Sequence, residues 1–362
     1  MPNRLSRLRS RLAEKGIDAL FVSQPENRYY LSGFLGSSGF LLIDERNAVL
    51  ATDFRYLEQA KAQAPDFTIF PIKNNLNEWL PALADGLRGK RLGFEAGDIP
   101  VATHRRMQDA LKKADLPVRL VPAESLVEEL RAVKEPGEIE LITRAARLAD
   151  EACEEAIARL EPGQTELEIA WEIEQSLRER GSQSVPFEII VASGPNAALP
   201  HHRPTDRPVQ KGEPITIDMG AKVAAYASDL TRTVCLGRPD ETFRKIYDAV
   251  LGAQLAAMAI IKEGMTGAEA DSLARTVIQE AGYGEAFGHA LGHGVGLATH
   301  EAPRLGPGTK ETLLSGMVFT IEPGIYLPGW GGVRIEDLVV MESGGVRALS
   351  RAEKVTRYDR HD

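Results

Sequence analysis

ITIDMGAKVAAYASDLTRTVCL, residues 215–236, is the stretch that decides the fold of this chain. It contains two apolar, strand-like runs, each with one acid, Asp218 or Asp229, on either side of a short segment at Val223 and Ala224. A hairpin that turns at this segment places the two carboxylates directly opposite each other on one face. Because an unpaired buried carboxylate costs several kcal/mol or takes up a proton, the pair calls for a cation.

A second stretch, MVFTIEPGIYLPGWGGVRIEDLVV at 317–340, repeats this arrangement. A hairpin that turns at PGWGG, residues 328–332, places Glu322 opposite Glu336. If the two acidic faces meet, four negative charges need about four positive ones, which two divalent metal ions supply. The alternative is two hairpins with unrelated surface acids, and the apolar residues that flank all four acids argue against it.

A glycine-rich segment, GHALGHGVGLATHE at 288–301, adds His293 as a fifth candidate ligand. Its glycines allow a close approach of the backbone; they are Gly288, Gly292, Gly294 and Gly296. Five of the seven histidines fall in the same half of the chain as the acids, at positions 201, 202, 289, 293 and 300. A set of oxygen ligands with one nitrogen suits Mn²⁺, Co²⁺, Fe²⁺ or Zn²⁺, and ligand type does not choose among them.

The bulk composition is that of a soluble globular protein with 362 residues, long enough for two domains. The net charge of −9 argues against nucleic acid or an anionic membrane surface as a partner. No apolar run reaches the ~18–20 residues of a membrane span, and the basic N-terminus lacks the apolar core of a secretory signal. Two cysteines, Cys153 and Cys235, form no disulfide framework, so we expect a cytoplasmic protein.

The pattern along the chain predicts three parts. Residues 1–125 alternate helical and strand signals and form an α/β domain, 126–136 form a helical connector that ends at Pro136, and 137–362 hold all the candidate ligands. In this last part a long helix ends at Pro162-Gly163, and the next begins with a capping box from Thr165 to Glu168. Two further helices at roughly 241–263 and 266–281 precede the second hairpin. Because helix, helix and hairpin occur twice in this order, we expect an internal duplication with the metal site between its halves.

From about residue 130 onward the chain resembles the metal-dependent Xaa-Pro peptidases, prolidase and aminopeptidase P, which are relatives of methionine aminopeptidase with the pita-bread fold. The matching segments are SGPNAALPHH, IDMGAKVAAYASDLTRTV, GHALGHGVGLATHE, TIEPGIY and GGVRIEDLVV. The segments PENRYYLSGF and TDFRYLEQA resemble the smaller N-terminal domain that these enzymes share with creatinase. The resemblance implies an α/β (α+β) protein, in which a creatinase-like α/β domain precedes a pita-bread catalytic domain with a pseudo-twofold internal repeat.

The same resemblance implies a role for each site residue. Two divalent ions would be held by Asp218, Asp229, His293, Glu322 and Glu336, with Mn²⁺ expected first and Co²⁺, Zn²⁺ or Fe²⁺ as alternatives. Glu322 would also handle the proton of the attacking water, and His201 would lie near the scissile carbonyl and stabilise the oxyanion. His289 and His300 would line the substrate pocket on either side of His293. His202 would be structural, and Arg334 would hold a ligand carboxylate in place. Arg304 would pair with a substrate carboxylate, although a surface arginine fits that position equally well.

These roles imply a homodimeric peptidase in which hydroxide bridging the two ions attacks an Xaa-Pro bond. An Xaa-Pro dipeptidase is slightly favoured. An aminopeptidase P acting on longer peptides, or a dipeptidase with another preference at the second residue, remains open. A non-catalytic binding protein and a metal-free amidinohydrolase such as creatinase are the other readings on this fold, and the intact ligands and pocket histidines argue against both.

Overall fold

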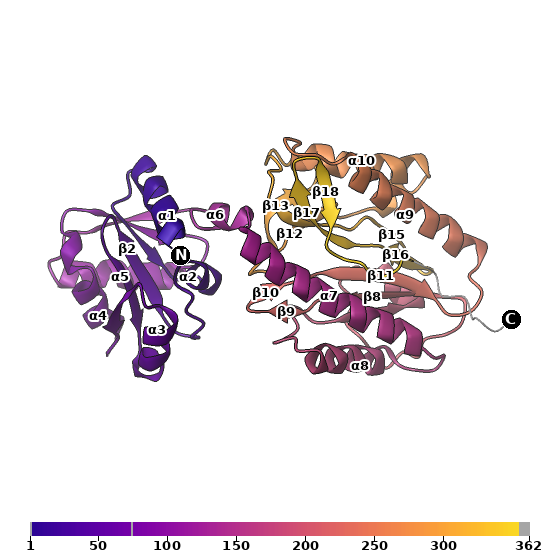
Figure 1. Ribbon diagram of the computed structural model, residues 1–362, viewed down its shortest axis with the longest axis horizontal. Coiled ribbons are helices and arrows are strands. Elements are labelled where there is room, and N and C mark those ends of the chain that lie inside the picture. Colours follow the sequence, from indigo (N-terminus) through magenta and orange to yellow (C-terminus); the bar gives the residue numbers. More distant parts are fainter. Residues whose placement is uncertain (1, 74, 355–362) are drawn as a thin grey trace. The chain divides into compact units, whose positions relative to one another are not determined.

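A computed structural model describes residues 2–73 and 75–354 and divides the chain into two compact units, Met1–Arg131 and Ala132–Asp362 (Figure 1). The division falls inside the range 126–136 that the sequence assigned to a connector. Every candidate ligand lies in the second unit.

The first unit is built on a six-stranded mixed sheet with the order β4-β3-β2-β1-β5-β6. Its strands are β1 (Ala19–Val22), β2 (Phe40–Asp44), β3 (Ala48–Thr52), β4 (Thr68–Pro71), β5 (Arg91–Glu95) and β6 (Arg119–Ala123). Its main helices are α1 (Pro2–Glu14), α2 (Pro25–Ser32), α3 (Leu57–Gln63), α4 (Leu76–Leu83) and α5 (Val101–Lys113). Leu5, Leu8 and Leu12 of α1 are buried, as expected from their spacing.

The expected helical connector is correct in part. Within 126–135, α6 (Glu128–Ala132) is helical, and Val133 beyond it forms an isolated β-bridge with Met317. Pro136 begins the next helix, α7 (Pro136–Arg159), instead of ending the connector. A proline is well suited to the first helical turn because the N–H that it lacks has no helical partner there.

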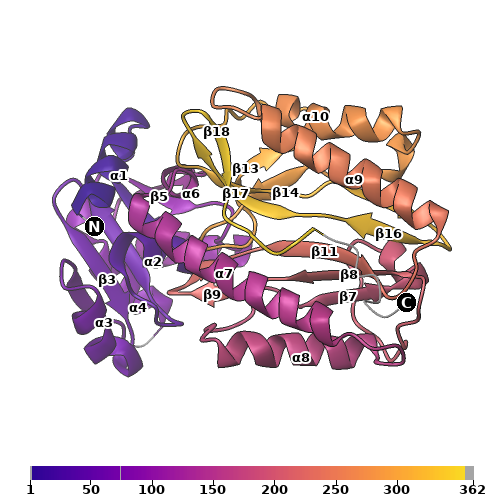
Figure 2. The same ribbon diagram turned by 45° about the vertical axis from the view of Figure 1, so that its right-hand side comes forward.

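The second unit consists of two similar halves (Figure 2). The first half contains α7, α8 (Glu166–Glu179), β7 (Ile190–Ser193), β8 (Pro214–Met219), β9 (Lys222–Val223), β10 (Tyr226–Ala227) and β11 (Leu230–Cys235). The second contains α9 (Glu241–Ile260), α10 (Gly267–Glu280), β12 (Gly292–Gly294), β13 (Glu301–Leu305), β14 (Val318–Ile321), β15 (Gly324–Leu327), β16 (Gly331–Arg334), β17 (Asp337–Glu342) and β18 (Gly345–Ala348). The main sheets are antiparallel, with orders β11-β8-β7 and β13-β12-β14-β17-β18.

Backbone contacts confirm the internal repeat. Helices α8 and α10 both start with a capping box, at Thr165 and at Thr266, and each of these threonines forms an isolated bridge with a later loop. Two residues on, the N–H of Leu167 donates to the carbonyl of Thr205, and the N–H of Ala268 donates to that of Thr309. The two helix starts are therefore fastened in the same way, although the residues around them differ.

The predicted register is correct for the second hairpin and wrong for the first. Ile321 pairs with Asp337 and Gly324 with Arg334, so Glu322 and Glu336 lie in register between two paired stretches. In the first hairpin Asp218 pairs with Thr231 instead of Asp229. The turn there uses Ala224 and Ala225, both with positive φ of 47° and 71°, which is the geometry of a two-residue hairpin loop. The resulting shift is two residues, which keeps both acids on the same face.

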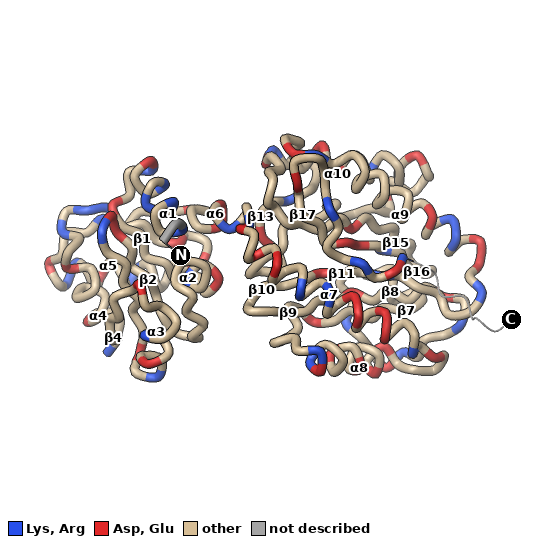
Figure 3. The backbone as a smooth tube through the Cα atoms, viewed as in Figure 1, with Lys and Arg blue, Asp and Glu red and all other residues tan. Residues whose placement is uncertain are grey.

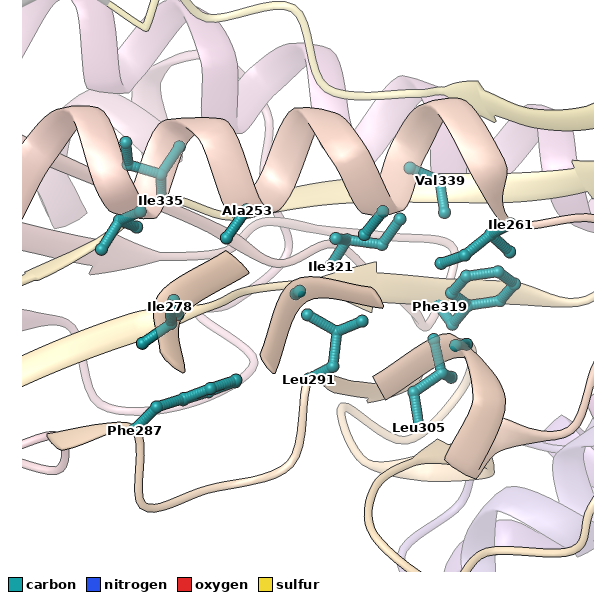
Figure 4. Packing of buried hydrophobic residues seen from close by; sticks show 14 of the residues in the cluster. Ala253, Ile261, Ile278, Phe287, Leu291, Leu305, Phe319, Ile321, Ile335 and Val339 are labelled. Carbon is teal, nitrogen blue, oxygen red and sulfur yellow. The ribbon is translucent and has the colours of Figure 1, made fainter. Parts of the chain in front are cut away.

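The core of the second half lies between helices α9 and α10 and the strands they cover (Figure 4). It is built from aliphatic and aromatic side chains of several elements, among them Ala253, Ile261, Ile278, Leu305, Phe319, Ile321 and Val339. Phe319 and Ile321 belong to β14, the strand directly before Glu322. Packing of this strand against the helices therefore fixes the backbone from which Glu322 projects.

Charged residues of both signs are interspersed along the helices (Figure 3). Within residues 2–73 and 75–354, no helix is both long enough and apolar enough to cross a membrane.

Candidate metal centre

Three of the five predicted ligand residues converge on one point. Asp229, His293 and Glu336 each offer one donor atom, and these atoms all lie within 4.8 Å of one another. Asp229 lies directly before β11, His293 is the middle residue of β12, and Glu336 lies between β16 and β17. The cluster therefore joins strands from both halves of the repeat.

The other two predicted ligands border this cluster. Nε2 of His293 lies 3.3 Å from a carboxylate oxygen of Glu322 and 3.7 Å from one of Asp229. One oxygen of Asp218 accepts a hydrogen bond of 2.7 Å from Arg334, while its other oxygen, Oδ1, is buried without a hydrogen-bond partner. A buried carboxylate oxygen of this kind is a ready ligand for a cation.

Two threonines orient these ligands. The Thr231 hydroxyl donates to Glu336 over 2.6 Å, and the Thr320 hydroxyl donates to Glu322 over 2.9 Å. Nδ1 of His293 lies 3.2 Å from the carbonyl of its neighbour Gly294, which can only accept, so this nitrogen carries the proton. The unprotonated Nε2 then faces the carboxylates, as a metal-binding imidazole requires.

The acids are unfavourable to one another as they stand. Burial raises the pKa of Asp229, and the charges of Glu336, Asp218 and Glu322 raise it further. Burial also raises the pKa values of Glu336 and of Glu322. Burial lowers the pKa of His293, which keeps its ring neutral. Together these groups fit divalent cations, because dications stabilise crowded carboxylates and coordinate neutral imidazole.

Gly292 and Gly294 position His293, because they allow β12 to lie close to its neighbouring strands. A Cβ on Gly292 would lie 2.0 Å from the carbonyl oxygen of Thr320, and one on Gly294 would lie 2.1 Å from that of Ala302. Both distances are far below van der Waals contact, so β12 can approach its neighbours only with glycine at these positions. Gly288 was also expected to allow a close backbone approach, but a Cβ there would meet nothing within 4 Å.

A pocket of about 810 Å³ opens over the cluster. Its lining includes all five predicted ligands, the predicted pocket histidines His201, His289 and His300, and the arginines Arg203, Arg304 and Arg334. Phe187 and Ile190 add an apolar part to this lining. The ring of His300 lies 3.9 Å from that of His293, and burial together with this neighbour lowers the pKa of His300 to about 4.

A hydrogen-bond chain leads from the pocket to the acids through Tyr326. Nδ1 of His289 donates to the carbonyl of Ala290 over 2.8 Å, so Nε2 is left to accept from the Tyr326 hydroxyl over 2.9 Å. Arg334 donates to the same hydroxyl over 3.0 Å and to Asp218. These hydrogen bonds fix the orientation of both His289 and Arg334.

The remaining sequence candidates, His202 and Arg304, also line the pocket. His202 points to Glu166, with 2.8 Å between its Nε2 and the carboxylate, and its side chain is 8% exposed. Arg304 is an exposed residue at the wall of the pocket. Arg203, which the sequence did not single out, forms an exposed ion pair with Glu188 at the same pocket.

Sequence reasoning missed several residues that shape the site. Tyr326 stands inside the quoted segment TIEPGIY, and its position four residues after Glu322 was the available signal. Thr231 follows two residues after Asp229 and shares its face of the strand. Glu166 carried no signal, because an acid in the first turn of a helix is common.

Comparison with known proteins places this geometry in a family. Residues 140–343 match the model of metallopeptidase family M24, and residues 4–133 match that of the creatinase/prolidase N-terminal domain. The chain belongs to metallopeptidase family M24. As a member of this family it is a metal-dependent peptidase, and the donor set described above fits divalent ions.

Relatives within family M24 match over almost their whole length. The chain is 37% identical over 356 residues to a Xaa-Pro dipeptidase of Pyrococcus furiosus, covering 98% of this chain and 99% of the relative. A structure titled Xaa-Pro dipeptidase from Bacillus anthracis superimposes with a TM-score of 0.94 at 38% identity, covering 98% and 99% of the two chains. A structure titled X-Pro aminopeptidase from Thermotoga maritima gives 0.87 at 37% identity, covering 96% and 99%.

Proposed function

We propose that this chain hydrolyses the Xaa-Pro bond of dipeptides with two divalent metal ions held by Asp218, Asp229, His293, Glu322 and Glu336. The observation that carries the proposal is the cluster of Asp229, His293 and Glu336, which draws donor atoms from both halves of the repeat and shares one pocket with Asp218 and Glu322. The similarity to proteins named Xaa-Pro dipeptidase supports the choice of substrate.

The two ions, when bound, supply an acidic water as nucleophile at neutral pH and positive charge for the carbonyl oxygen. Glu322 takes the proton of the attacking water and passes it towards the leaving nitrogen, because its carboxylate borders the cluster and its pKa is raised by burial. Arg334 holds Asp218 in its binding orientation. His201 lies at the pocket wall, where it donates to the carbonyl oxygen as negative charge develops there.

His289 and His300 form the walls on either side of His293 and exclude water from the reacting bond. The lowered pKa of His300 keeps its ring neutral at physiological pH, so it can accept as well as donate a hydrogen bond. Arg304 pairs with the free carboxylate of the substrate at the outer part of the pocket. A carboxylate held there favours a dipeptide, because a longer peptide carries its carboxylate farther from the scissile bond.

An aminopeptidase P that acts on longer peptides is the second candidate, and the similarity to the Thermotoga maritima structure titled X-Pro aminopeptidase favours it. Measured kcat/KM values for Ala-Pro and Ala-Pro-Ala separate the two. A dipeptidase prefers Ala-Pro, and Arg304→Ala lowers kcat/KM for Ala-Pro more than for its C-terminal amide. Equal loss for the acid and the amide would contradict the role of Arg304.

The metal requirement is tested by treatment with a chelator and measurement of Ala-Pro and Gly-Pro cleavage. We expect complete loss of turnover, its return after addition of Mn²⁺, Co²⁺ or Zn²⁺, and two ions per chain by elemental analysis. Full activity in the stripped protein would refute the proposal.

We further propose Mn²⁺ as the working ion, a homodimer as the active form and the cytoplasm as the location. The choice of Mn²⁺ follows from the resemblance to the Xaa-Pro peptidases, because ligand type does not choose among the four candidate ions. Cys153 and Cys235 are both buried and are not joined in a disulfide, which is compatible with a reducing compartment. The homodimer follows from the resemblance to the Xaa-Pro peptidases and is checked by light scattering.

A further inference from the structure

Glu166, the first residue of α8, has a fully buried carboxylate that the metal site does not use. Its side chain is 0% exposed. It accepts hydrogen bonds of 2.7–3.2 Å from Ser193 N and Oγ, Asn196 Nδ2, His202 Nε2, and Thr205 N and Oγ1. Burial raises the pKa of Glu166, but these hydrogen bonds outweigh it and the net pKa lies below the ordinary value. The group is therefore an anion, and His202 is the donor in their shared bond.

All the donors to this carboxylate come from residues 193–205, the last residue of β7 and the loop that follows it, which also carries His201. His201 and His202 both line the pocket, and His202 turns its Nε2 to the buried Glu166 over 2.8 Å. A single buried anion thus fastens the loop on both sides of His201, at Asn196 before it and at Thr205 after it. Several charge-assisted hydrogen bonds to one centre hold a loop more firmly than contacts spread over its surface.

The internal repeat shows that the helix itself does not need this carboxylate. Gly267 takes the place of Glu166 at the start of α10, after the same capping box and with equivalent backbone hydrogen bonds. There the backbone of β13 packs directly on the helix, since a Cβ on Gly267 would lie 2.0 Å from the carbonyl oxygen of Arg304. The fold can therefore fasten this helix start without an acid, so Glu166 serves the loop that it holds.

We propose that Glu166 and His202 are positioning residues that fix His201 at the wall of the pocket, facing the carbonyl of the bound peptide. The proposal rests on the proposed function, because it assigns these two residues to the same reaction. In this proposal Glu166 and His202 act through His201, on both sides of which they hold the backbone, and not through a contact of their own with substrate.

The test is a double-mutant cycle of His202→Ala and His201→Ala, measured as kcat and KM for Ala-Pro in the metal-loaded enzyme. We expect His202→Ala to lower kcat by roughly 10–100-fold, as loss of a supporting hydrogen bond commonly does, with KM and ion content nearly unchanged. In the His201→Ala background the same substitution should have little further effect, because its target is already absent. His202→Gln retains a donor and should recover part of kcat.

His104→Ala is the matched control, since His104 lies in the first unit with its ring stacked on Phe94 at 4.7 Å, and it should leave kcat unchanged. Glu166→Gln is a second variant that keeps the shape of the side chain but replaces one acceptor oxygen by a donor group. It should lower kcat at least as much as His202→Ala.

Hydrogen exchange of the amides in residues 193–205 tests, independently of the reaction, whether Glu166 and His202 hold this segment in place. We expect faster exchange there in His202→Ala and in Glu166→Gln, whatever substrate the enzyme prefers. If exchange is unchanged in these variants, Glu166 and His202 do not hold the segment. If His202→Ala lowers kcat equally with and without His201, the positioning role is wrong. If the wild type cleaves no Xaa-Pro peptide while exchange still rises in both variants, the proposed function fails and the positioning role falls with it, but the fastening of the loop stands.

Discussion

At Asp229, burial and the neighbouring negative charges both raise the pKa of the carboxylate. The carboxylate is 7% exposed, and the charges of Glu336, Asp218 and Glu322 all oppose its ionisation. Hydrogen bonds from Thr231 to Glu336 and from Arg334 to Asp218 relieve this repulsion in part. The site is therefore an example of a functional constellation that stabilises the protein only with its cations in place.

This balance predicts opposite effects of Asp229→Asn with and without metal. In chelator, the variant should be more stable than the wild type by about 0.5–2 kcal/mol, because it removes one of four crowded charges at constant shape. In saturating Mn²⁺ the order should reverse, because the wild type gains about 2.7 kcal/mol at a hundredfold excess over Kd while the variant binds poorly. Thermal unfolding in the two conditions measures both effects. An unchanged order of the two midpoints would refute the electrostatic account of the site.

Glu95 is the corresponding buried acid of the first unit. Its carboxylate accepts from the backbone N–H groups of Ser23 and Gln24 over 2.6 and 2.7 Å and from the side chain of Asn27 over 2.6 Å. Burial raises the pKa of Glu95 and the charge of Glu128 adds to this, although the three hydrogen bonds oppose it. The other charged groups that face it are Asp98, which shares the Ser23 hydroxyl, and Arg28.

A raised pKa in the folded state makes the contribution of Glu95 to stability largest below its unfolded pKa of ~4.3 and smaller as the pH rises through the folded pKa. We therefore expect the stability of the wild type relative to Glu95→Gln to decline from pH 4 towards pH 7. Urea unfolding followed by Trp79, in a background with Trp171 and Trp330 replaced by Phe, reports on this unit. If the stability of the wild type relative to Glu95→Gln stays constant or grows from pH 4 to pH 7, the hydrogen bonds to Glu95 outweigh the effect of its burial.

At the scale of elements, the two hairpins mark the limit of what the sequence can predict. The register of the second follows from PGWGG, which leaves few choices for the turn, so Glu322 and Glu336 were correctly paired. The first turn is Ala224-Ala225, two residues that carry no turn signal in the sequence but have positive φ in the hairpin. The apolar alternation still placed Asp218 and Asp229 on one face, because a shift of two residues preserves it. The connector was predicted correctly only at α6, because beyond it helical propensity competes with the pairing of Val133 to Met317, which is distant in sequence.

Strand β12 supplies an element-scale prediction. Gly292→Ala would place a Cβ 2.0 Å from the carbonyl oxygen of Thr320, so β12 must move away from β14 and carry His293 with it. We expect metal affinity to fall by about 10–100-fold, as it does when the support of a ligand is lost. Gly252→Ala in α9, where a Cβ meets nothing within 4 Å, is the control. Titration with Mn²⁺ measures the affinity. Equal dissociation constants for the two variants would mean that the strand adapts without displacing the ligand.

At the scale of the whole second unit, buried ionic contacts join segments that are far apart in the chain. Arg232, 2% exposed, donates to Asp337 and to the carbonyl of Ala352, which ties the first half to the second and to the end of the described chain. Lys134, at the beginning of the unit, lies 2.9 Å from Glu301 of β13. Long-range pairs of this kind cannot be read from one sequence, because periodicity identifies faces and elements but does not say which buried acid meets which buried base.

The pair of Lys134 and Glu301 has side chains only 1% and 7% exposed, so removal of one partner leaves an uncompensated charge. Lys134→Met should lower the free energy of unfolding of the second unit by about 3–5 kcal/mol. The double variant Lys134→Met/Glu301→Gln should recover much of this loss, because a neutral amide can still accept from the N–H of Ala298, as Glu301 does now. Urea unfolding in a Trp79→Phe background, which leaves Trp171 and Trp330 as reporters, measures both variants. If the double variant is no more stable than Lys134→Met, the cost comes from the lost packing of the lysine stem rather than from the stranded charge of Glu301.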